Sequence, residues 1–486
     1  MLPHSDRILK TKPKKKNLNI RVINIIFMTR KFINREIELK KIENLLSSNK
    51  FEFIVIYGRR RVGKTAVLKK AIEGKKALYF LCARRNIRYN LRKFSYKVCE
   101  FLNIPKAEFK SFFDAFEAIL SKERNPIVVM DEFGYLVEKD EGILSDFQEI
   151  VDEVLKDTKA KLILCGSYIS VMQGRVIGKK SPLYGRNTMQ LNLKPLKFGH
   201  LFEWFPKIKF EDALKIYAVT SGIPKYLEFF EGRDAENEIA EKFFDSSSFL
   251  YNDAINLLSE ELRDYSTYFQ ILEAIALGYT KITEIGNYAF IEAKDVYFYL
   301  KNLISLGIVE RAIPILAPRK GKRGIYKIKD NYFRFWFKFI SEFQEEIESY
   351  SQHIAIENFR KKFNTYLGEV FEDLCLELIK NLRFFPFTRI GKWWHKDKEI
   401  DIVALNEKMR EILFCECKWK DKVNAEKVCK ELAEKSQYVQ WHNKERKESF
   451  AIFAKSFSKK IKEFEGKKVY CFDLRDLEKV FRKKLC

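Results

Sequence analysis

A glycine-rich loop that directly follows a buried strand is the feature that most constrains this sequence. Residues 51–57 (FEFIVIY) are apolar apart from Glu52, which predicts a strand buried on both faces. The strand leads into a loop that matches G-x-x-x-x-G-K-[ST] at every fixed position, and its residues are Gly58, Arg59, Arg60, Arg61, Val62, Gly63, Lys64 and Thr65. Helical spacing follows over residues 66–72. Strand, loop and helix in this order predict a P-loop fold with a parallel sheet.

The residue types in this loop suit the binding of nucleotide phosphates. Glycines let backbone N–H groups close around the phosphates, and the start of the helix adds a positive dipole. Lys64 is expected to reach the β and γ phosphates, and Thr65 to offer its hydroxyl to Mg²⁺. The three arginines, residues 59–61, are most simply explained as solvated charges that set the local field.

Two later apolar runs place polar side chains at the ends of predicted strands. Residues 127–130 end in Asp131 and Glu132, and residues 161–166 end at Ser167. In a parallel sheet, groups at the carboxyl ends of strands face the ligand crevice. We therefore expect Asp131 to hold Mg²⁺ through water and Glu132 to orient or deprotonate the attacking water. Ser167 either senses the γ-phosphate or the water, or it caps the segment that follows.

Several motifs, taken in order along the chain, resemble the archaeal ATPase family, a P-loop branch related to AAA+ initiator-type and STAND signalling ATPases. They are Phe32-Ile-Asn-Arg-Glu36-x-Glu38-Leu39, the loop from Gly58 to Thr65, Asp131-Glu132-Phe133, Leu164-Cys-Gly-Ser167, Pro182-Leu-Tyr-Gly-Arg186 and Ser221-Gly-Ile-Pro224-x-Tyr226-Leu227. The resemblance covers nearly the whole chain from Met28 and implies an ATPase that uses ATP and Mg²⁺.

The same resemblance implies roles for two further motifs. It makes Arg186 a candidate arginine finger, acting in its own subunit or on a neighbouring subunit of a homo-oligomer. The alternative is an ordinary arginine in a turn. The segment Gly222-Ile-Pro224 resembles the lid motif that approaches the nucleotide in STAND relatives.

Composition and charge narrow the class of protein further. A hydrophobic content of 46% excludes a disordered basic protein, and no stretch of about 18 apolar residues predicts a membrane span. Nine cysteines without a CxxC pair favour a reducing cytoplasm. The net charge of +24 divides unevenly among five predicted segments: a basic tail or mis-assigned start at 1–27 (+6), a P-loop ATPase core at 28–195 (+13), a helical lid at 196–260 (−5), a winged-helix module at 261–345 (+3) and a nuclease-like domain at 346–486 (+7).

The middle module is predicted to be a winged helix, because three short helices precede two strands. The helices are expected at 268–276, 283–288 and 294–306, and the strands at 308–315 and 324–328. Basic residues gather in and around the strands without an acid among them: Arg311, Arg319, Lys320, Lys322, Arg323, Lys327 and Lys329. They favour contact with DNA phosphates, whereas residues 294–306 offer few side chains that read base edges. DNA contact and packing that couples ATP state to the next domain stay equal alternatives, and the aromatic segment 332–337 is interpreted as packing.

The last segment carries carboxylates with the spacing of a metal-dependent nuclease. Glu372 lies on a predicted helix, Asp401 on a predicted strand, and Glu416 and Lys418 on the next strand. Alternate strand residues share a face, so Glu399, Asp401 and Val403 are expected to point one way. Two carboxylates of this kind hold Mg²⁺ or Mn²⁺ beside a scissile phosphate, while the lysine positions or activates water.

This segment resembles the DEXX-box ATPase C-terminal domain, which is related to the PD-(D/E)XK nuclease fold. The alternative is a set of solvated or ion-paired strand charges on a domain kept for binding. The combined expectation is an α/β multidomain protein with a P-loop NTPase core, a helical lid, a winged helix and a restriction-endonuclease-like C-terminal domain. ATP hydrolysis would control nucleic-acid binding or cleavage. The other interpretation is a STAND-like signalling or scaffold ATPase whose nuclease-like domain is inactive and binds a partner.

Overall fold

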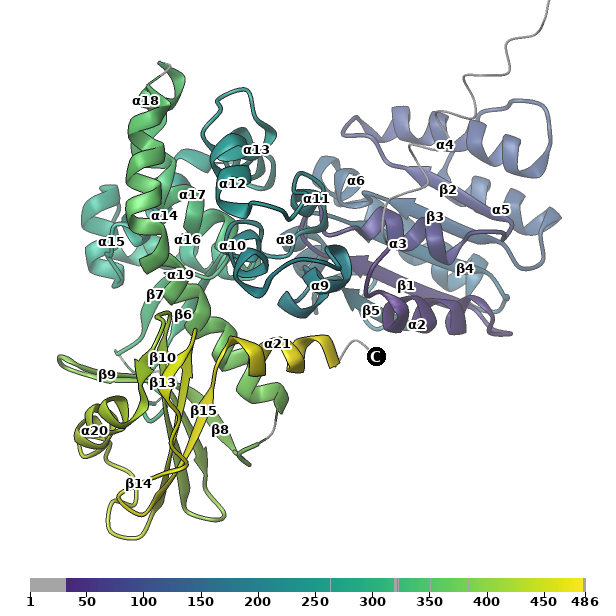
Figure 1. Cartoon of the computed structure of the whole chain (residues 1–486). Helices are drawn as coiled ribbons and strands as arrows, with labels where there is room; N and C mark the ends of the chain where they lie inside the picture. Colours follow the sequence, from purple (N-terminus) through teal and green to yellow (C-terminus); the bar gives the residue numbers. More distant parts are fainter. Residues whose placement is uncertain are drawn as a thin grey trace, which may run out of the picture.

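The computed structural model describes residues 32–483, apart from Arg263, Arg319, Lys320, Lys322, Tyr350 and Arg383 (Figure 1). The predicted basic tail at 1–27 and three of the basic wing residues therefore lie outside the described residues. Within the described part of the chain, no helix is both long and apolar enough to cross a membrane.

The N-terminal domain is built on a five-stranded sheet in which all neighbouring strands are parallel. The strands are β1 (Glu52–Tyr57), β2 (Ala77–Leu81), β3 (Ile127–Asp131), β4 (Lys161–Gly166) and β5 (Met189–Asn192), in the order β2-β3-β4-β1-β5. Strand β1 lies between β4 and β5 and is fully buried, as its apolar sequence predicts. The strands expected from residues 51–57, 127–130 and 161–166 are thereby confirmed.

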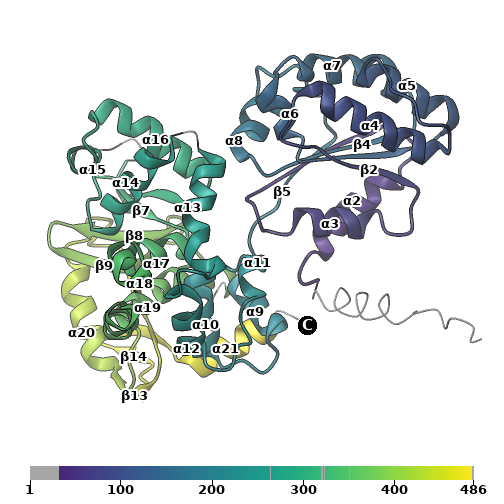
Figure 2. The same ribbon diagram turned by 90° about the horizontal axis from the view of Figure 1, so that it is seen from above.

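Helices cover both faces of this sheet (Figure 2). Helices α2 (Glu36–Leu46) and α3 (Lys64–Ala71) pack on one face, with a small apolar core between them and the sheet. The other face carries α4 (Ile87–Leu102), α5 (Phe112–Lys122), α6 (Gly134–Lys139), α7 (Ile143–Glu149), the π-helical segments Ile150–Leu155 and Met172–Val176, and α8 (Ile169–Val171). Phe94, Phe116 and Phe147 lie at the centre of this second core.

The segment expected to form a helical lid contains only helices among its regular elements. They are the 3₁₀ turn Phe198–His200, α9 (Leu201–Trp204), α10 (Phe210–Thr220), α11 (Pro224–Leu227), α12 (Ala235–Phe243) and α13 (Phe249–Glu261). Proline at the first position of α11 suits a helix start, since its missing N–H is unpaired there in any helix.

The next module shows the predicted order of three helices and two strands. Helices α14 (Tyr265–Ala276), α15 (Ile282–Ala289) and α16 (Ala293–Ser305) precede the antiparallel strands β6 (Val309–Ala312) and β7 (Ile325–Ile328). After them come α17 (Asn331–Phe339), the 3₁₀ turn Ser341–Phe343 and α18 (Gln344–Glu348). Phe335 and Trp336 of α17 are fully buried against aromatic rings of neighbouring helices, so the interpretation of this aromatic segment as packing is confirmed.

The C-terminal domain is a mixed sheet with a long helix on one face. Helix α19 (Gln352–Leu382) precedes β8 (Arg389–His395), β9 (Lys398–Asn406), β10 (Glu411–Lys418), β11 (Val423–Asn424), α20 (Ala425–Ser436), β12 (Lys447–Ala454), β13 (Phe457–Lys459), β14 (Glu463–Phe464), β15 (Lys467–Phe472) and α21 (Leu474–Lys483). The main sheet has the order β14-β15-β12-β10-β9-β8, and α20 covers the face opposite α19. The terminal helix α21 returns to the lid, where the Phe481 ring packs against Phe198 and Phe210.

The apolar cores divide the described residues into two bodies (Figure 2). The sheet of the N-terminal domain has its own core on each face. One continuous core runs from the lid through α17 and α19 to the underside of the C-terminal sheet. The chain passes from the first body to the second just after β5.

Candidate functional site

The glycine-rich loop joins β1 to α3 as predicted. A Cβ atom on Gly58 would lie 2.3 Å from the carbonyl oxygen of Leu193, so only glycine allows this close approach of β1 to the segment after β5. Gly63 has a φ of 92° and caps the start of α3. Val62 is fully buried, which anchors the loop from below. The loop backbone is thus fixed at the start of a helix, where N–H groups without an intrahelical partner suit an anion.

Lys64 lies over the loop rather than in solvent. Its side chain is 5% exposed, and its ammonium donates hydrogen bonds to the carbonyl oxygens of Gly58 and Arg59, both at 2.9 Å. The ammonium is therefore held at the loop by its backbone carbonyl groups, and its contact with nucleotide phosphates stays a prediction.

Asp131 and Thr65 meet at the end of β3. The Thr65 hydroxyl donates to Asp131 Oδ2 at 2.9 Å, and the Tyr79 hydroxyl donates to the same oxygen at 2.5 Å. Burial, followed by the hydrogen bond to Asp131, raises the pKa of Tyr79, so its hydroxyl remains a donor. Thr65 and Asp131 were each expected to bind Mg²⁺, and the structure places them in contact, whereas Tyr79 was missed. Its strand, ALYFL at 77–81, is an apolar run that could have indicated a residue beside the third strand.

Glu132 and Ser167 form a second pair next to the loop. Glu132 has a φ of 56°, an uncommon value for a residue other than glycine and one that tends to occur at functional sites. Its carboxylate accepts hydrogen bonds from the Ser167 backbone N–H at 3.1 Å and the Ser167 hydroxyl at 2.5 Å. Ser167 therefore fixes Glu132, a role that differs from both of the alternatives stated for it.

A cavity of about 850 Å³ lies between the N-terminal domain and the lid. Lys64, Thr65, Glu132 and Ser167 line it beside the loop. Apolar side chains of the N-terminal segment and the lid also line it: Phe32, Ile33, Leu196, Trp204, Phe205, Pro224, Leu227 and Phe230. A lining with both polar groups of the loop and aromatic side chains suits a molecule with phosphates and a flat base. Pro224 of the predicted lid motif reaches this cavity, and the Lys225 N–H lies 3.4 Å from the Arg61 carbonyl oxygen.

The three loop arginines are not solvated, so that expectation is wrong. Arg59 forms an ion pair with Asp330, at the start of α17. Arg60 lies 3.2 Å from Glu260 and 3.3 Å from Glu261, at the end of α13. Arg61 lies 2.5 Å from Asp253 of the same helix. The physical reason is that acids of α13 and of the start of α17, which are distant in the sequence, pack directly against the basic loop.

Burial is the largest influence on the pKa of two of these carboxylates. It raises the pKa of Asp253 to about 6 and that of Glu261 to about 7, although arginines of the loop act in the opposite direction. Glu261 also interacts with Lys64 and Glu132, so it belongs electrostatically to the site. Sequence reasoning missed these acids as site residues. The opposite net charges of segments 28–195 and 196–260 could have indicated Asp253, whereas Glu261 lies in the next segment, whose net charge is +3.

Arg186 does not line this cavity. Its guanidinium forms two hydrogen bonds with Asp152, at 2.8 Å and 2.6 Å, and a third with the Pro182 carbonyl oxygen. The structure therefore does not bring Arg186 to the loop of its own chain. Its role toward a neighbouring subunit stays a prediction.

The four predicted nuclease residues lie on α19, β9 and β10, and each has a partner. The Glu372 carboxylate pairs with Lys392 at 2.6 Å, and Asp401 Oδ2 accepts the Cys417 N–H at 2.7 Å. Glu416 pairs with Lys418 at 2.7 Å and with Lys435 of α20 at 3.1 Å. Among the described residues, no three His, Cys, Asp or Glu side chains are grouped closely enough to hold a metal ion.

The predicted strand alternation fails at Asp401. The pairing of β8 with β9 shifts between Gly391 and Trp393, which face Val403 and Ile400, so β9 carries one extra residue there. As a result, Ile400 packs in the core under α20 while Ile402 packs in the core under α19. Burial, then the charges of Glu416 and Glu372, raise the pKa of Asp401 to about 7, so the three carboxylates still interact.

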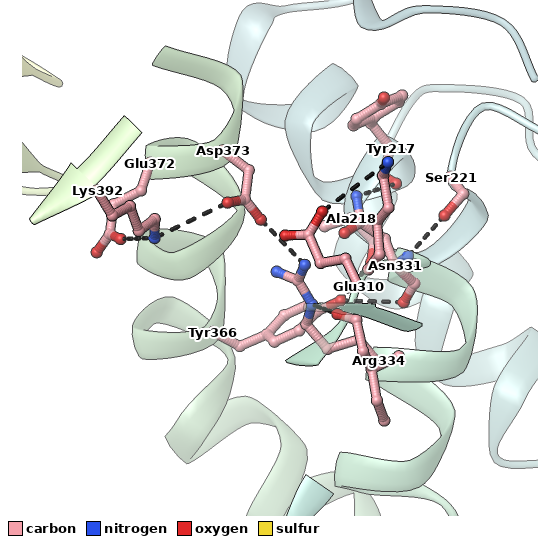
Figure 3. Close-up of polar contacts among 12 residues, drawn as sticks. Tyr217, Ala218, Ser221, Glu310, Asn331, Arg334, Tyr366, Glu372, Asp373 and Lys392 are labelled. Carbon is pink, nitrogen blue, oxygen red and sulfur yellow. Dashed lines mark hydrogen bonds and ion pairs between the residues drawn. The ribbon is translucent and has the colours of Figure 1, made fainter. Parts of the chain in front are cut away.

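Glu372 also belongs to a polar network that ties the C-terminal domain to the lid (Figure 3). Lys392 lies between Glu372 and Asp373, and Asp373 pairs with Arg334 of α17 at 3.0 Å. The Tyr366 hydroxyl lies 2.6 Å from the Ala218 carbonyl oxygen and 3.1 Å from that of Asn331. The network joins α10, α17, α19 and β8; Glu372 takes part in it through Lys392 of β8, and Asp373 makes the contact with α17.

Two family descriptions match the chain. Residues 32–230 match an ATPase domain found predominantly in Archaea. Residues 336–429 match a family described as archaeal and bacterial proteins of unknown function. The chain is 39% identical over 457 residues to the uncharacterized protein MJECL04 of Methanocaldococcus jannaschii, which covers 92% of this chain and 99% of that protein.

Two further similarities are partial. The uncharacterized ATP-binding protein MJ0423 of the same organism is 51% identical over 45 residues, which are 9% of this chain and 76% of that protein. The solved Aeropyrum pernix ORC2 protein covers 69% of this chain and 98% of its own at 15% identity, with a TM-score of 0.39. A score this low carries no inference about function.

Proposed function

The chain belongs to the archaeal family that carries the ATPase domain matched by residues 32–230. We propose that it binds ATP together with Mg²⁺ and hydrolyses it in the cavity between the core and the lid. The observation that carries the proposal is the convergence of Lys64, Thr65 and Glu132 in the lining of one cavity. The aromatic and apolar residues of the same lining would enclose the base.

The residues of this site fit the nucleotide and its metal ion. The Thr65 hydroxyl and Asp131 already contact each other at 2.9 Å, and both oxygens are ligand types that Mg²⁺ prefers. Mg²⁺, when bound, would neutralise charge on the phosphate oxygens. Loop N–H groups and the Lys64 ammonium would bind the phosphates, and Glu132, held by Ser167, would orient or deprotonate the attacking water.

Substitution of Lys64 by alanine tests this function. Lys64→Ala removes the ammonium over the loop, so we expect ATP binding to weaken strongly and hydrolysis to fall to background. Isothermal titration and phosphate release measure the two quantities. Unchanged binding and hydrolysis in Lys64→Ala would remove the proposal.

We further propose that nucleotide state is coupled to nucleic-acid binding or cleavage by the C-terminal domain. The basic residues Arg311, Lys327 and Lys329 on or beside β6 and β7 support phosphate contact, as does the net charge of +7 over residues 346–486. Cleavage with Mg²⁺ or Mn²⁺ would use Asp401, Glu416 and Lys418. The test compares DNA nicking by the parent protein and Glu416→Ala in either metal, and equal activity in both proteins would exclude cleavage at this site.

One observation favours the second candidate, a signalling or scaffold ATPase whose C-terminal domain only binds a partner. Glu372, Asp401 and Glu416 are each engaged by a cation or a backbone N–H. Helix α16 and the turn before it also expose aromatic rings, with Phe290 94% and Phe298 60% exposed, rather than side chains that read bases. Absence of both DNA binding and Mn²⁺ binding would favour this candidate.

A further inference from the structure

The two bodies of the molecule meet across the nucleotide cavity through charged contacts. Of the described residues before Leu193, Ile169 alone belongs to the large apolar core of the second body. Facing surfaces that are packed separately and joined by polar groups are the ones that open most readily. The ion pairs at this joint therefore bear on how a nucleotide enters and leaves.

Three consecutive loop arginines supply these ion pairs. We call them, with their partners, the arginine clasp: Arg59 with Asp330, Arg60 with Glu260 and Glu261, and Arg61 with Asp253. All partners lie in the second body. The carboxylates are mostly withdrawn from water, since Asp253 is 0%, Asp330 3% and Glu261 9% exposed.

We infer that the ion pairs of the arginine clasp hold the two bodies together and thereby control nucleotide exchange. The inference rests on the proposed function and concerns the regulation of the same site. Arg60, Arg61 and Glu260 line the cavity, so the clasp closes the space in which the phosphates would lie. A nucleotide can fit behind the closed clasp, because the cavity of about 850 Å³ is present with every pair formed.

The direction of the effect follows from the burial of the charges. Removing one partner of a buried ion pair leaves an uncompensated charge in the closed joint, which strongly favours opening. Removing both partners leaves no such charge, and the closed joint is nearly restored. A single substitution should therefore speed nucleotide exchange, and the matching double substitution should slow it again.

Arg59 and Asp330 are the pair best suited to the test. Arg59 does not line the cavity, so its substitution leaves the phosphate contacts in place. Asp330 also caps α17 by accepting the Phe333 N–H at 3.0 Å, and asparagine preserves that cap. The Arg59 guanidinium lies 5.6 Å from the centre of the Phe333 ring, where a methionine side chain retains apolar contact.

The experiment measures release of a fluorescent ADP analogue by stopped flow from the full-length protein. We expect Arg59→Met and Asp330→Asn each to speed release at least about tenfold, which corresponds to about 1.4 kcal/mol, and Arg59→Met/Asp330→Asn to return to within about threefold of the parent. Arg446→Met, which breaks the buried Arg446–Glu448 pair in the C-terminal sheet, is the matched control and should release ADP at the parent rate.

Two results would overturn the inference. Single variants that release ADP at the parent rate would show that the clasp does not limit exchange. A double variant in which the two effects multiply would show that the residues act independently rather than as a pair.

A second readout needs no nucleotide, and so separates this inference from the proposed function. Hydrogen exchange of residues 58–66 and 253–262 in the nucleotide-free protein should be faster in the single variants and near the parent in the double variant. A parent that binds no ADP would refute the proposed function, while this exchange pattern alone would then decide whether the clasp holds the joint. Unchanged exchange in the single variants would refute the clasp.

Discussion

Substitution of Gly58 by alanine tests the geometry on which the nucleotide site depends. The added Cβ would lie 2.3 Å from the Leu193 carbonyl oxygen and 3.2 Å from its carbon atom. That carbonyl cannot move freely, because the Leu193 N–H donates to the Tyr57 carbonyl oxygen at 2.7 Å and Arg35 donates to the Lys194 carbonyl oxygen at 2.8 Å. The start of the loop must therefore shift by about 1 Å, at a cost of about 1 to 3 kcal/mol.

A shift of this size should affect function more than folding. Misplacement of a reacting group by about 1 Å lowers rates on the order of 100-fold, so we expect Gly58→Ala to lose about that much in kcat/KM for ATP while it stays folded. Gly174→Ala is the matched control, since a Cβ there meets nothing within 4 Å. Steady-state phosphate release measures both variants, and circular dichroism reports folding. A Gly58→Ala variant within about threefold of the parent would refute the steric reasoning.

Three further substitutions test a hydrogen bond in the site, a buried carboxylate and the separation of the apolar cores. Ser167→Ala removes the hydroxyl that donates to Glu132 but keeps the backbone N–H, so ATP hydrolysis should slow about tenfold with little change in ATP affinity, as measured by single-turnover kinetics and titration. Burial raises the pKa of Glu261 in the folded protein from 4.5 to about 7. The contribution of the protonated side chain to the free energy of unfolding is therefore full below about pH 4.5 and is lost as the pH rises through about 7. Urea unfolding should therefore show that the free energy of unfolding of Glu261→Gln rises by up to about 3 kcal/mol relative to that of the parent between pH 4.5 and pH 8. A difference in unfolding free energy that does not depend on pH would contradict the pKa shift. Trp336→Ala opens a cavity in the core of the second body, so the free energy of unfolding of that body should fall by about 3 to 5 kcal/mol. Calorimetry should show an unchanged transition for the N-terminal domain, which has separate cores.

The parts of the fold that the sequence predicted are those set by neighbouring residues. The strand before Gly58 and the helix after Lys64 follow from the order of apolar, glycine and polar residues, and so does the polar end of β3 at Asp131. Each of these patterns extends over ten residues or fewer, and the parallel sheet then brings the strand ends together.

The parts that could not be predicted depend on contacts distant in the sequence. Arg59 and Asp330 are separated by 271 positions, and no local pattern links them. The hydrogen bond from Tyr79 to Asp131 requires β2 to lie beside β3, which only the strand order decides. The extra residue in β9 near Asp401 changes the face of the strand without a glycine or proline to mark it.

Glu372 illustrates a different limit of sequence reasoning. Its spacing from Asp401 and Glu416 is that of a nuclease site, yet Lys392 holds it in a network between modules. A carboxylate on a helix fits a metal site and a structural ion pair equally well in sequence. Only the structure shows that the Lys392 ammonium pairs with Glu372.

In the proposed function, ATP is hydrolysed in the cavity between the core and the lid, and Glu132 is the residue that activates water. The most direct measurement compares Mg²⁺-dependent ATP binding and turnover by the parent protein and Glu132→Gln. Glutamine keeps the size of the side chain and one oxygen that accepts the Ser167 N–H, while its NH₂ group can donate to the Ser167 hydroxyl, which rotates to accept it, so the site should remain intact. We expect Glu132→Gln to bind ATP as tightly as the parent and to turn it over at least about 100-fold more slowly. Turnover at the parent rate would show that Glu132 does not activate the water.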